Sequence, residues 1–228
     1  MSRKLSCVWW ALFLAFFATG CVHRVYHDPA FTRARIQAGG LALGGVTALG
    51  GGEYVAADAI ASVVQREFQT ARPWLRVVPL ADVRKGIDPA LYAQRLKQVS
   101  EGSSWTSRDF EIFRTLPNRP RFILVVDVQS QGESVKARLY DEHYYGDGYW
   151  ERDYNPSASA RRWIKVFFVI YDLQTAKPAW ITKGTGHMGA YRRLSPIAPL
   201  DLRDPIGIPS IAEIIEPLAR HAGHRLPH

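Results

Sequence analysis

The sequence predicts a single domain of the α/β (α+β) class, in which helices pack against one mixed β-sheet. Three observations support this class. Strand and helical patterns alternate in the first half of the chain, four strand patterns in two long antiparallel hairpins follow, and a helical pattern closes it. A hydrophobic content of 47% suits a globular chain and excludes a disordered one.

The first twenty residues have the three parts of a secretory signal peptide. Arg3 and Lys4 form a positive start, residues 8–17 form an apolar core, and Ala18 begins a run of small residues. The apolar core is shorter than the roughly 20 residues that a bilayer-spanning helix needs. We therefore expect residues 1–20 to be removed on export.

The residues Ala18-Thr19-Gly20-Cys21 resemble the lipobox of bacterial lipoproteins. The resemblance implies that the Cys21 thiol receives a diacylglyceryl group, that the mature chain begins there, and that acyl chains such as palmitate anchor it. Val22 follows, where inner-membrane lipoproteins usually carry Asp, so the resemblance favours the periplasmic face of the outer membrane. An ordinary signal peptide with an incidental cysteine is the alternative. Cys7 would be lost with the leader, so no intramolecular disulfide is expected.

Residues 21–35 are polar and mixed, and we expect them to form a tether before a domain spanning residues 36–222 and a tail spanning 223–228. Within the first half, strand patterns cover 36–43 and 75–80. Helical patterns cover 53–72, 89–98 and 107–116, the first with apolar residues at spacings of three and four.

The second half begins with strand patterns at 121–129 and 134–140, joined by an expected polar turn, "SQGES". The segments "RRWIKVFFVIYD" and "AWITKGTGHM" form the second expected pair. A closing helix starts at Ser210, carries an apolar isoleucine stripe and is expected to bend at Pro217 and to end at Gly223.

The helix at 54–68, "FILVVDV" and "VIYDLQTAKPAW" together resemble envelope lipoproteins whose domain is similar to the amino-terminal domain of TolB. The curli-secretion lipoprotein and the lipoprotein activators of penicillin-binding proteins share that layout. The resemblance covers about residues 36–190 and implies a non-catalytic protein with an envelope partner.

No cofactor motif, metal-ligand set or catalytic constellation is visible in the sequence. His187 lacks an identifiable nucleophile and orienting acid, and Asp172 is expected to bond to the backbone of the turn that follows it. The net charge of +8 permits nucleic-acid binding, but the export signal argues against that partner.

Residues 141–160 connect two expected strands through a long loop rich in aromatic rings. Amphipathic rings are common anchors at protein interfaces and also stack on sugars. The candidate partner-binding residues are Tyr144, Tyr145, Tyr149, Trp150 and Tyr154. In the alternative interpretation, the rings extend the strands and cover an edge of the core.

We therefore expect a lipid-anchored, non-catalytic envelope protein that recruits or assembles a periplasmic partner. A module that binds cell-wall glycan or a small ligand through residues 141–160 is the first alternative. A hydrolase that uses His187 is the second.

Overall fold

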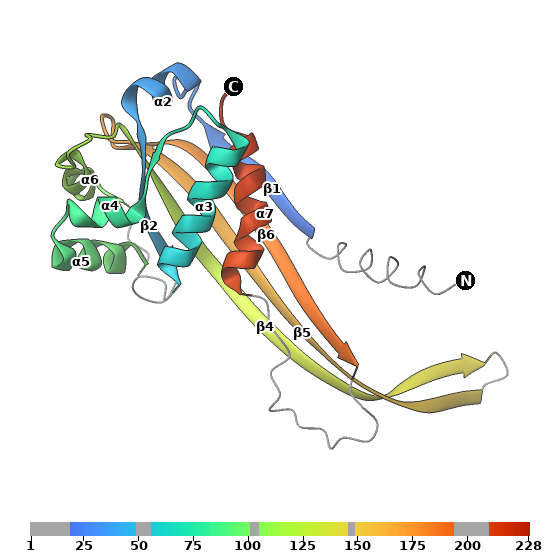
Figure 1. Ribbon diagram of the computed structural model, residues 1–228. Coiled ribbons are helices and arrows are strands. Elements are labelled where there is room, and N and C mark those ends of the chain that lie inside the picture. Colours follow the sequence, from blue (N-terminus) through green and yellow to red (C-terminus); the bar gives the residue numbers. More distant parts are fainter. Residues whose placement is uncertain (1–18, 49–55, 101–104, 146–148, 194–209) are drawn as a thin grey trace, which may run out of the picture. The chain divides into compact units, whose positions relative to one another are not determined.

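A computed structural model describes residues 19–48, 56–100, 105–145, 149–193 and 210–228 of the chain (Figure 1). It confirms the predicted fold class, because helices pack against a mixed six-stranded sheet. The expected signal peptide, residues 1–20, lies almost entirely outside the described residues. Within the described residues, no helix is both long and apolar enough to cross a membrane.

The strands follow the order β1-β6-β5-β4-β2-β3 across the sheet. β2 pairs in parallel with β3 and β4, and Leu41 lies opposite both Val77 and Phe122. β4, β5 and β6 are consecutive neighbours joined by short connections, which only antiparallel strands permit. Their bounds are β1 Thr19–His27, β2 Leu41–Ala48, β3 Val77–Val78, β4 Phe122–Tyr145, β5 Tyr149–Asp172 and β6 Lys177–Arg193.

The helices are α2 Arg33–Gly39, α3 Ala57–Ala71, α4 Leu80–Lys85, α5 Pro89–Ser100, α6 Ser107–Arg114 and α7 Ile211–His224. α3 and α7 lie side by side on one face of the sheet, whereas α4 and α5 pack near β2 (Figure 1). The helical patterns at 53–72, 89–98 and 107–116 therefore correspond to α3, α5 and α6.

The chain divides into two compact units. The main unit comprises Gly20–Gln131, Ile164–Gly186 and Ile211–His228. The second unit includes Gly132–Trp163 and His187–Ser210. Within the second unit, Arg162 Nη2 lies 2.8 Å from Glu133 Oε2, which ties β5 to β4.

The hydrophobic core of the main unit lies between the sheet and the α3/α7 layer. The Phe68 ring of α3 lies 5.9 Å from Phe168 on β5 and 6.3 Å from Trp180 on β6. Gly184 allows Leu218 of α7 to approach β6, since a Cβ there would be 3.4 Å from the Leu218 side chain. The side chains of these packing residues are all fully buried, namely Phe68, Phe168, Trp180 and Leu218.

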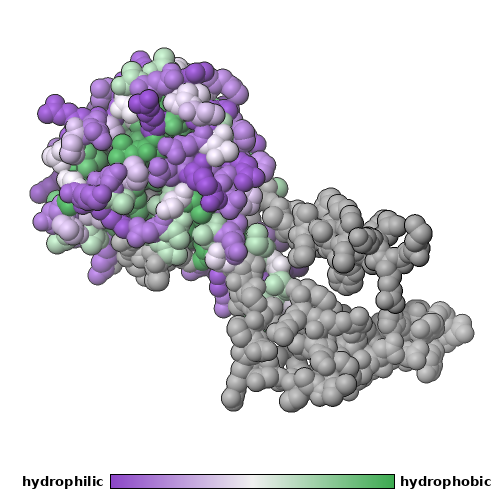
Figure 2. Space-filling view, viewed as in Figure 1, coloured by the Kyte–Doolittle hydropathy of each residue, from purple (hydrophilic) through white to green (hydrophobic). Residues whose placement is uncertain are grey.

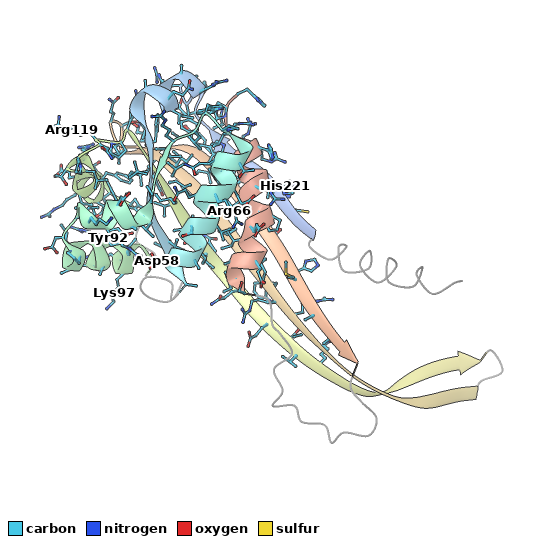
Figure 3. All side chains as sticks on the ribbon, viewed as in Figure 1. Asp58, Arg66, Tyr92, Lys97, Arg119 and His221 are labelled. Carbon is cyan, nitrogen blue, oxygen red and sulfur yellow. The ribbon has the colours of Figure 1, made fainter. Side chains whose placement is uncertain are left out.

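A buried carboxylate holds α3 and α7 together at their solvent edge. Glu67 of α3 is 3% exposed and accepts hydrogen bonds from Arg66 Nε at 2.9 Å and from Arg220 Nε at 2.7 Å. Burial alone would raise the pKa of Glu67, but the bonds from Arg220 and Arg66 outweigh it and hold that pKa below its usual value. Arg66 and His221, labelled in Figure 3, mark the two helices of this layer.

The expected tether at residues 21–35 is wrong. Residues 19–27 form β1, the edge strand beside β6, and the chain then enters α2, with Thr32 as its N-cap. Val22 and Phe31 are buried, and the Phe31 ring lies 5.1 Å from that of Phe122. An edge strand is half solvated, so its mixed polarity is compatible with strand structure as well as with a tether.

Three other boundaries differ from the prediction. The strand expected at 36–43 begins only at Leu41, after α2 ends at Gly39 and its C-cap, Gly40, adopts a φ of 70°. The strand expected at 75–80 shrinks to Val77–Val78, because α4 begins at Leu80 with Pro79 as its N-cap. α7 continues through Gly223 to His224.

The polar turn expected at residues 130–134 is also wrong, since β4 runs through it without a break. Gly132 is the reason that this segment reads as a turn. In the structure it gives room to Trp163 of β5, because a Cβ on Gly132 would lie 2.4 Å from that indole ring. The two expected antiparallel pairs therefore become β4/β5 and β5/β6, which share β5.

Candidate functional site

Cys21 lies near the start of β1 as a free thiol on an exposed residue. The end of the same strand is fixed to β6, because the Asp28 N–H donates to Ala179 O at 2.9 Å. The thiol is therefore accessible to an acylating enzyme or a lipid surface. Whether it carries acyl chains remains a prediction.

Exposure alternates along β5 and separates two faces of the sheet in the main unit. Ile164, Val166, Phe168 and Ile170 are buried on the face that α3 and α7 cover. The intervening residues are only half-buried, although most of them are apolar. The described residues therefore do not fully cover this opposite side of the sheet.

The same alternation continues on β6, where Trp180, Thr182 and Gly184 are buried while Ile181 and Lys183 are half-buried. Lys165 on β5 places its Nζ 5.6 Å from the centroid of the Phe167 ring, a cation–π distance. We call the half-buried set the open face: Lys165, Phe167, Val169, Ile181 and Lys183.

One end of the open face is closed by α6 and by Trp105, which precedes the N-cap of that helix, Thr106. The Tyr171 ring lies 5.0 Å from Phe110 and 6.3 Å from Trp105. Burial raises the pKa of Tyr171 to about 12, with a smaller contribution from the charge of Asp127. Tyr171 is thus a neutral hydroxyl at neutral pH.

The turn after β5 behaves as the sequence predicts. Asp172 Oδ1 accepts a hydrogen bond from the Gln174 N–H at 2.9 Å, and its other oxygen lies 2.7 Å from Arg121 Nη2. Asp172 is therefore committed to holding the β5/β6 turn against the start of β4. It has the structural role expected of it.

The aromatic candidates lie on strands, so the expected long loop at 141–160 is wrong. Tyr144 and Tyr145 end β4, whereas Tyr149, Trp150 and Tyr154 lie in the first part of β5. Only residues 146–148 between the strands lie outside the description. The five residues are thus brought to one end of the β4/β5 pair, and their role in binding stays a prediction.

The open face offers apolar contact area flanked by cations, a combination that also occurs at protein interfaces. Its only ionisable side chains are those of Lys165 and Lys183, and it contains no Ser, Cys, His, Asp or Glu. Within the described part of the chain, no cluster of His, Cys, Asp and Glu could hold a metal ion. His187, exposed on β6, belongs to the second unit.

The sequence analysis missed the open face, although a signal was present. From Trp163 to Tyr171 the only polar residue is Lys165, so β5 is apolar on both sides. Such a strand needs cover on both faces. α6 supplies this cover at the Tyr171 end, whereas the described part of the chain covers the open face only in part.

No family model matches the chain, and no curated protein matches it. Among solved structures, it is similar to the PelC dodecamer from Paraburkholderia phytofirmans, at 15% identity and a TM-score of 0.31. A leucine-to-methionine variant of that dodecamer gives 14% identity and a TM-score of 0.32. Each comparison covers 88% of this chain and 98% of the other. Similarity this low leaves function to be argued from the chain's own residues.

Proposed function

We propose that this chain is a non-catalytic lipoprotein of the outer membrane, anchored at the periplasmic face through acyl chains on Cys21, that recruits or assembles an envelope protein. The open face is the observation that carries the proposal. On this face Phe167, Val169 and Ile181 are only half-buried, whereas apolar side chains in a core are fully buried. A partner that covers these side chains removes apolar surface from water and gains about 25 cal/mol per Å².

The two lysines of the open face indicate which charge the partner should carry. Lys165 and Lys183 flank the apolar residues, so an acidic rim on the partner would complement them. Lys165 also lies over the Phe167 ring, which keeps the cation beside the apolar contact instead of away from it. The preferred partner is therefore a protein with an apolar centre and acidic margins.

The lipobox supports a location in the envelope, and the TolB-like resemblance supports a protein without catalytic machinery at that location. The aromatic residues at the end of β4/β5 offer a second contact, where Tyr149 and Trp150 would act as interface anchors. Neither argument depends on the open face.

The test purifies the full-length protein from crosslinked envelopes and compares it with a Phe167→Ser, Val169→Ser double variant. We expect a stable partner with the wild type and its loss in the double variant. Glu111→Ser, an exposed change on α6, should retain the partner. Recovery of no stable partner with the wild type would contradict the proposal, as would unchanged recovery with the double variant.

A second arm separates the aromatic residues from the open face. Tyr149→Ala together with Trp150→Ala should weaken partner binding by roughly thirtyfold if the rings are anchors. The melting temperature should then move little. A large fall in melting temperature would instead show that the rings seal part of the core.

A further inference from the structure

A recess of about 390 Å³ opens in the main unit between α2 and the segment that joins α3 to β3. One wall comes from the end of α2, namely Ile36, Gln37 and Gly40. The other wall is the segment Pro73–Arg76, which includes Trp74. The volume lies in the range of small-ligand sites, which is roughly 300–1,000 Å³.

The lining combines an apolar base with polar groups at the rim. Ile36 and Leu75 are 2% and 3% exposed, whereas Gln37 and Arg76 are exposed. The guanidinium of Arg33 lies 5.2 Å from the centroid of the Trp74 ring. Among the described residues, neither Arg33 nor Arg76 is in ion-pair contact with an acidic side chain.

The arginines determine the sign of the net charge around the recess. α2 and α3 both end here, and each helix end contributes about half a negative charge at most. That charge is partly satisfied, because the Gly40 N–H donates to Ile36 O and Arg72 Nη1 donates to Ala71 O at 3.3 Å. The two full positive charges on Arg33 and Arg76 exceed the partial negative charge that is left at the two helix ends. The recess therefore favours an anion.

We propose that this recess binds an acidic saccharide unit, such as a uronic acid residue of a polymer. Arg33 lies over the Trp74 ring without lining the recess, and the other face of the indole is a flat amphipathic surface for the apolar side of a sugar ring. The Arg76 guanidinium presents two parallel N–H donors, which match a carboxylate. The Gln37 amide can both donate to and accept from sugar hydroxyls.

The position of the recess argues for a polymer instead of a lipid headgroup. Seven residues of extended chain separate Cys21 from Asp28, a distance of about 23 Å along a strand. α2 follows at the far end of β1 from Cys21 (Figure 1). If the chain is anchored at Cys21 as proposed above, the recess is held away from the bilayer. Only this orientation rests on the proposed anchor.

The test is calorimetric titration of the detergent-extracted full-length protein with short oligomers of glucuronic acid and with neutral glucose oligomers of equal length. We expect saturable binding of the acidic oligomer and at least about tenfold weaker binding of the neutral one. Arg76→Gln should weaken acidic binding by about tenfold or more. Arg35→Gln removes a charge from α2 outside the lining and should change acidic binding by less than about twofold.

Several outcomes would overturn the proposal. Absence of saturable binding, equal binding of the neutral oligomer, or an equal loss in Arg35→Gln would each do so, the last because it indicates diffuse attraction. Equal binding of an acidic glutamate peptide would show a general carboxylate site without sugar selectivity. The Phe167→Ser, Val169→Ser variant should keep saccharide binding while it loses the partner, so failure of this proposal and failure of the proposed function are distinguishable.

Discussion

Cys21 is the residue at which the sequence predicts lipid attachment. Its thiol is exposed near the start of β1. With no tether between this residue and the sheet, a lipid on Cys21 would hold the main unit directly at the membrane surface. Two or three acyl chains hold firmly, since each buried methylene contributes about 0.8 kcal/mol.

Cys21→Ser should therefore abolish labelling by a radioactive fatty acid, and the protein should leave the membrane fraction or stay as an uncleaved precursor. Wild-type protein is the reference in both assays. Wild-type protein that takes up no fatty acid would show that the lipobox reading is mistaken.

The burial of Tyr92 predicts how the stability of the fold depends on pH. Its hydroxyl donates to Gly44 O at 2.9 Å, and burial raises the pKa of Tyr92 to about 12. Because the folded pKa exceeds the unfolded value near 10, the stabilisation is fully present below about pH 10. It is lost as the pH rises through about 12, by roughly 2–3 kcal/mol.

Tyr92→Phe should remove this contribution to the pH dependence, as measured by urea unfolding at a series of alkaline pH values. Tyr26→Phe, on exposed β1, is the matched control and should leave the dependence as it is in the wild type. An unchanged slope in Tyr92→Phe would mean that Tyr92 titrates alike in the folded and unfolded chain.

At the scale of elements, the contact between α3 and α7 depends on Gly223. A Cβ on Gly223 would lie 2.8 Å from Ala71 Cβ and 3.2 Å from Phe68 Cα, which is backbone and cannot simply rotate away. Alanine favours a helix by about 1 kcal/mol over glycine. Overpacking typically costs about 1–3 kcal/mol, so we expect the crowding to dominate.

Gly223→Ala should thus lower the free energy of unfolding in chemical denaturation, against the helix propensity. Thr70→Ala, an exposed change on α3, improves propensity without crowding and should not destabilise. A Gly223→Ala protein as stable as Thr70→Ala would show that α3 and α7 have room to separate.

Elements with a regular apolar period could be predicted from the sequence. α3 and α7 are examples, and α7 carries its isoleucine stripe although Pro217 interrupts its hydrogen bonding, whereas the patterns of α5 and α6 are weaker. Elements whose structure depends on contacts with segments distant in the sequence could not be predicted. β1 is recognisable only once β6 lies beside it, and Gly132 suggests a turn until Trp163 is placed over it.

The candidate sites show the same division. Cys21 and the Asp172 turn depend on local sequence and were predicted, although acylation itself awaits its test. The open face and the recess by Trp74 are products of tertiary packing, because they combine residues from separate elements. On the face shown in Figure 2, hydrophilic residues dominate the described surface and apolar patches lie between them.

For the whole molecule, we propose separate tasks for three regions of the main unit. In this proposal Cys21 attaches the chain to the membrane, the recess by Trp74 binds an acidic saccharide, and the open face binds a protein partner. α3 and α7 cover the other side of the sheet with a complete core and a paired charge cluster. The central claim is that the partner contacts the open face and not that helical layer.

Site-specific photo-crosslinking in intact envelopes tests this claim most directly. A photoreactive residue is placed at Phe167, on the open face, and in a second protein at Thr70, on α3 across the sheet. We expect one adduct of defined mass from position 167 and none from position 70. No adduct from position 167, or the same adduct from both positions, would contradict it.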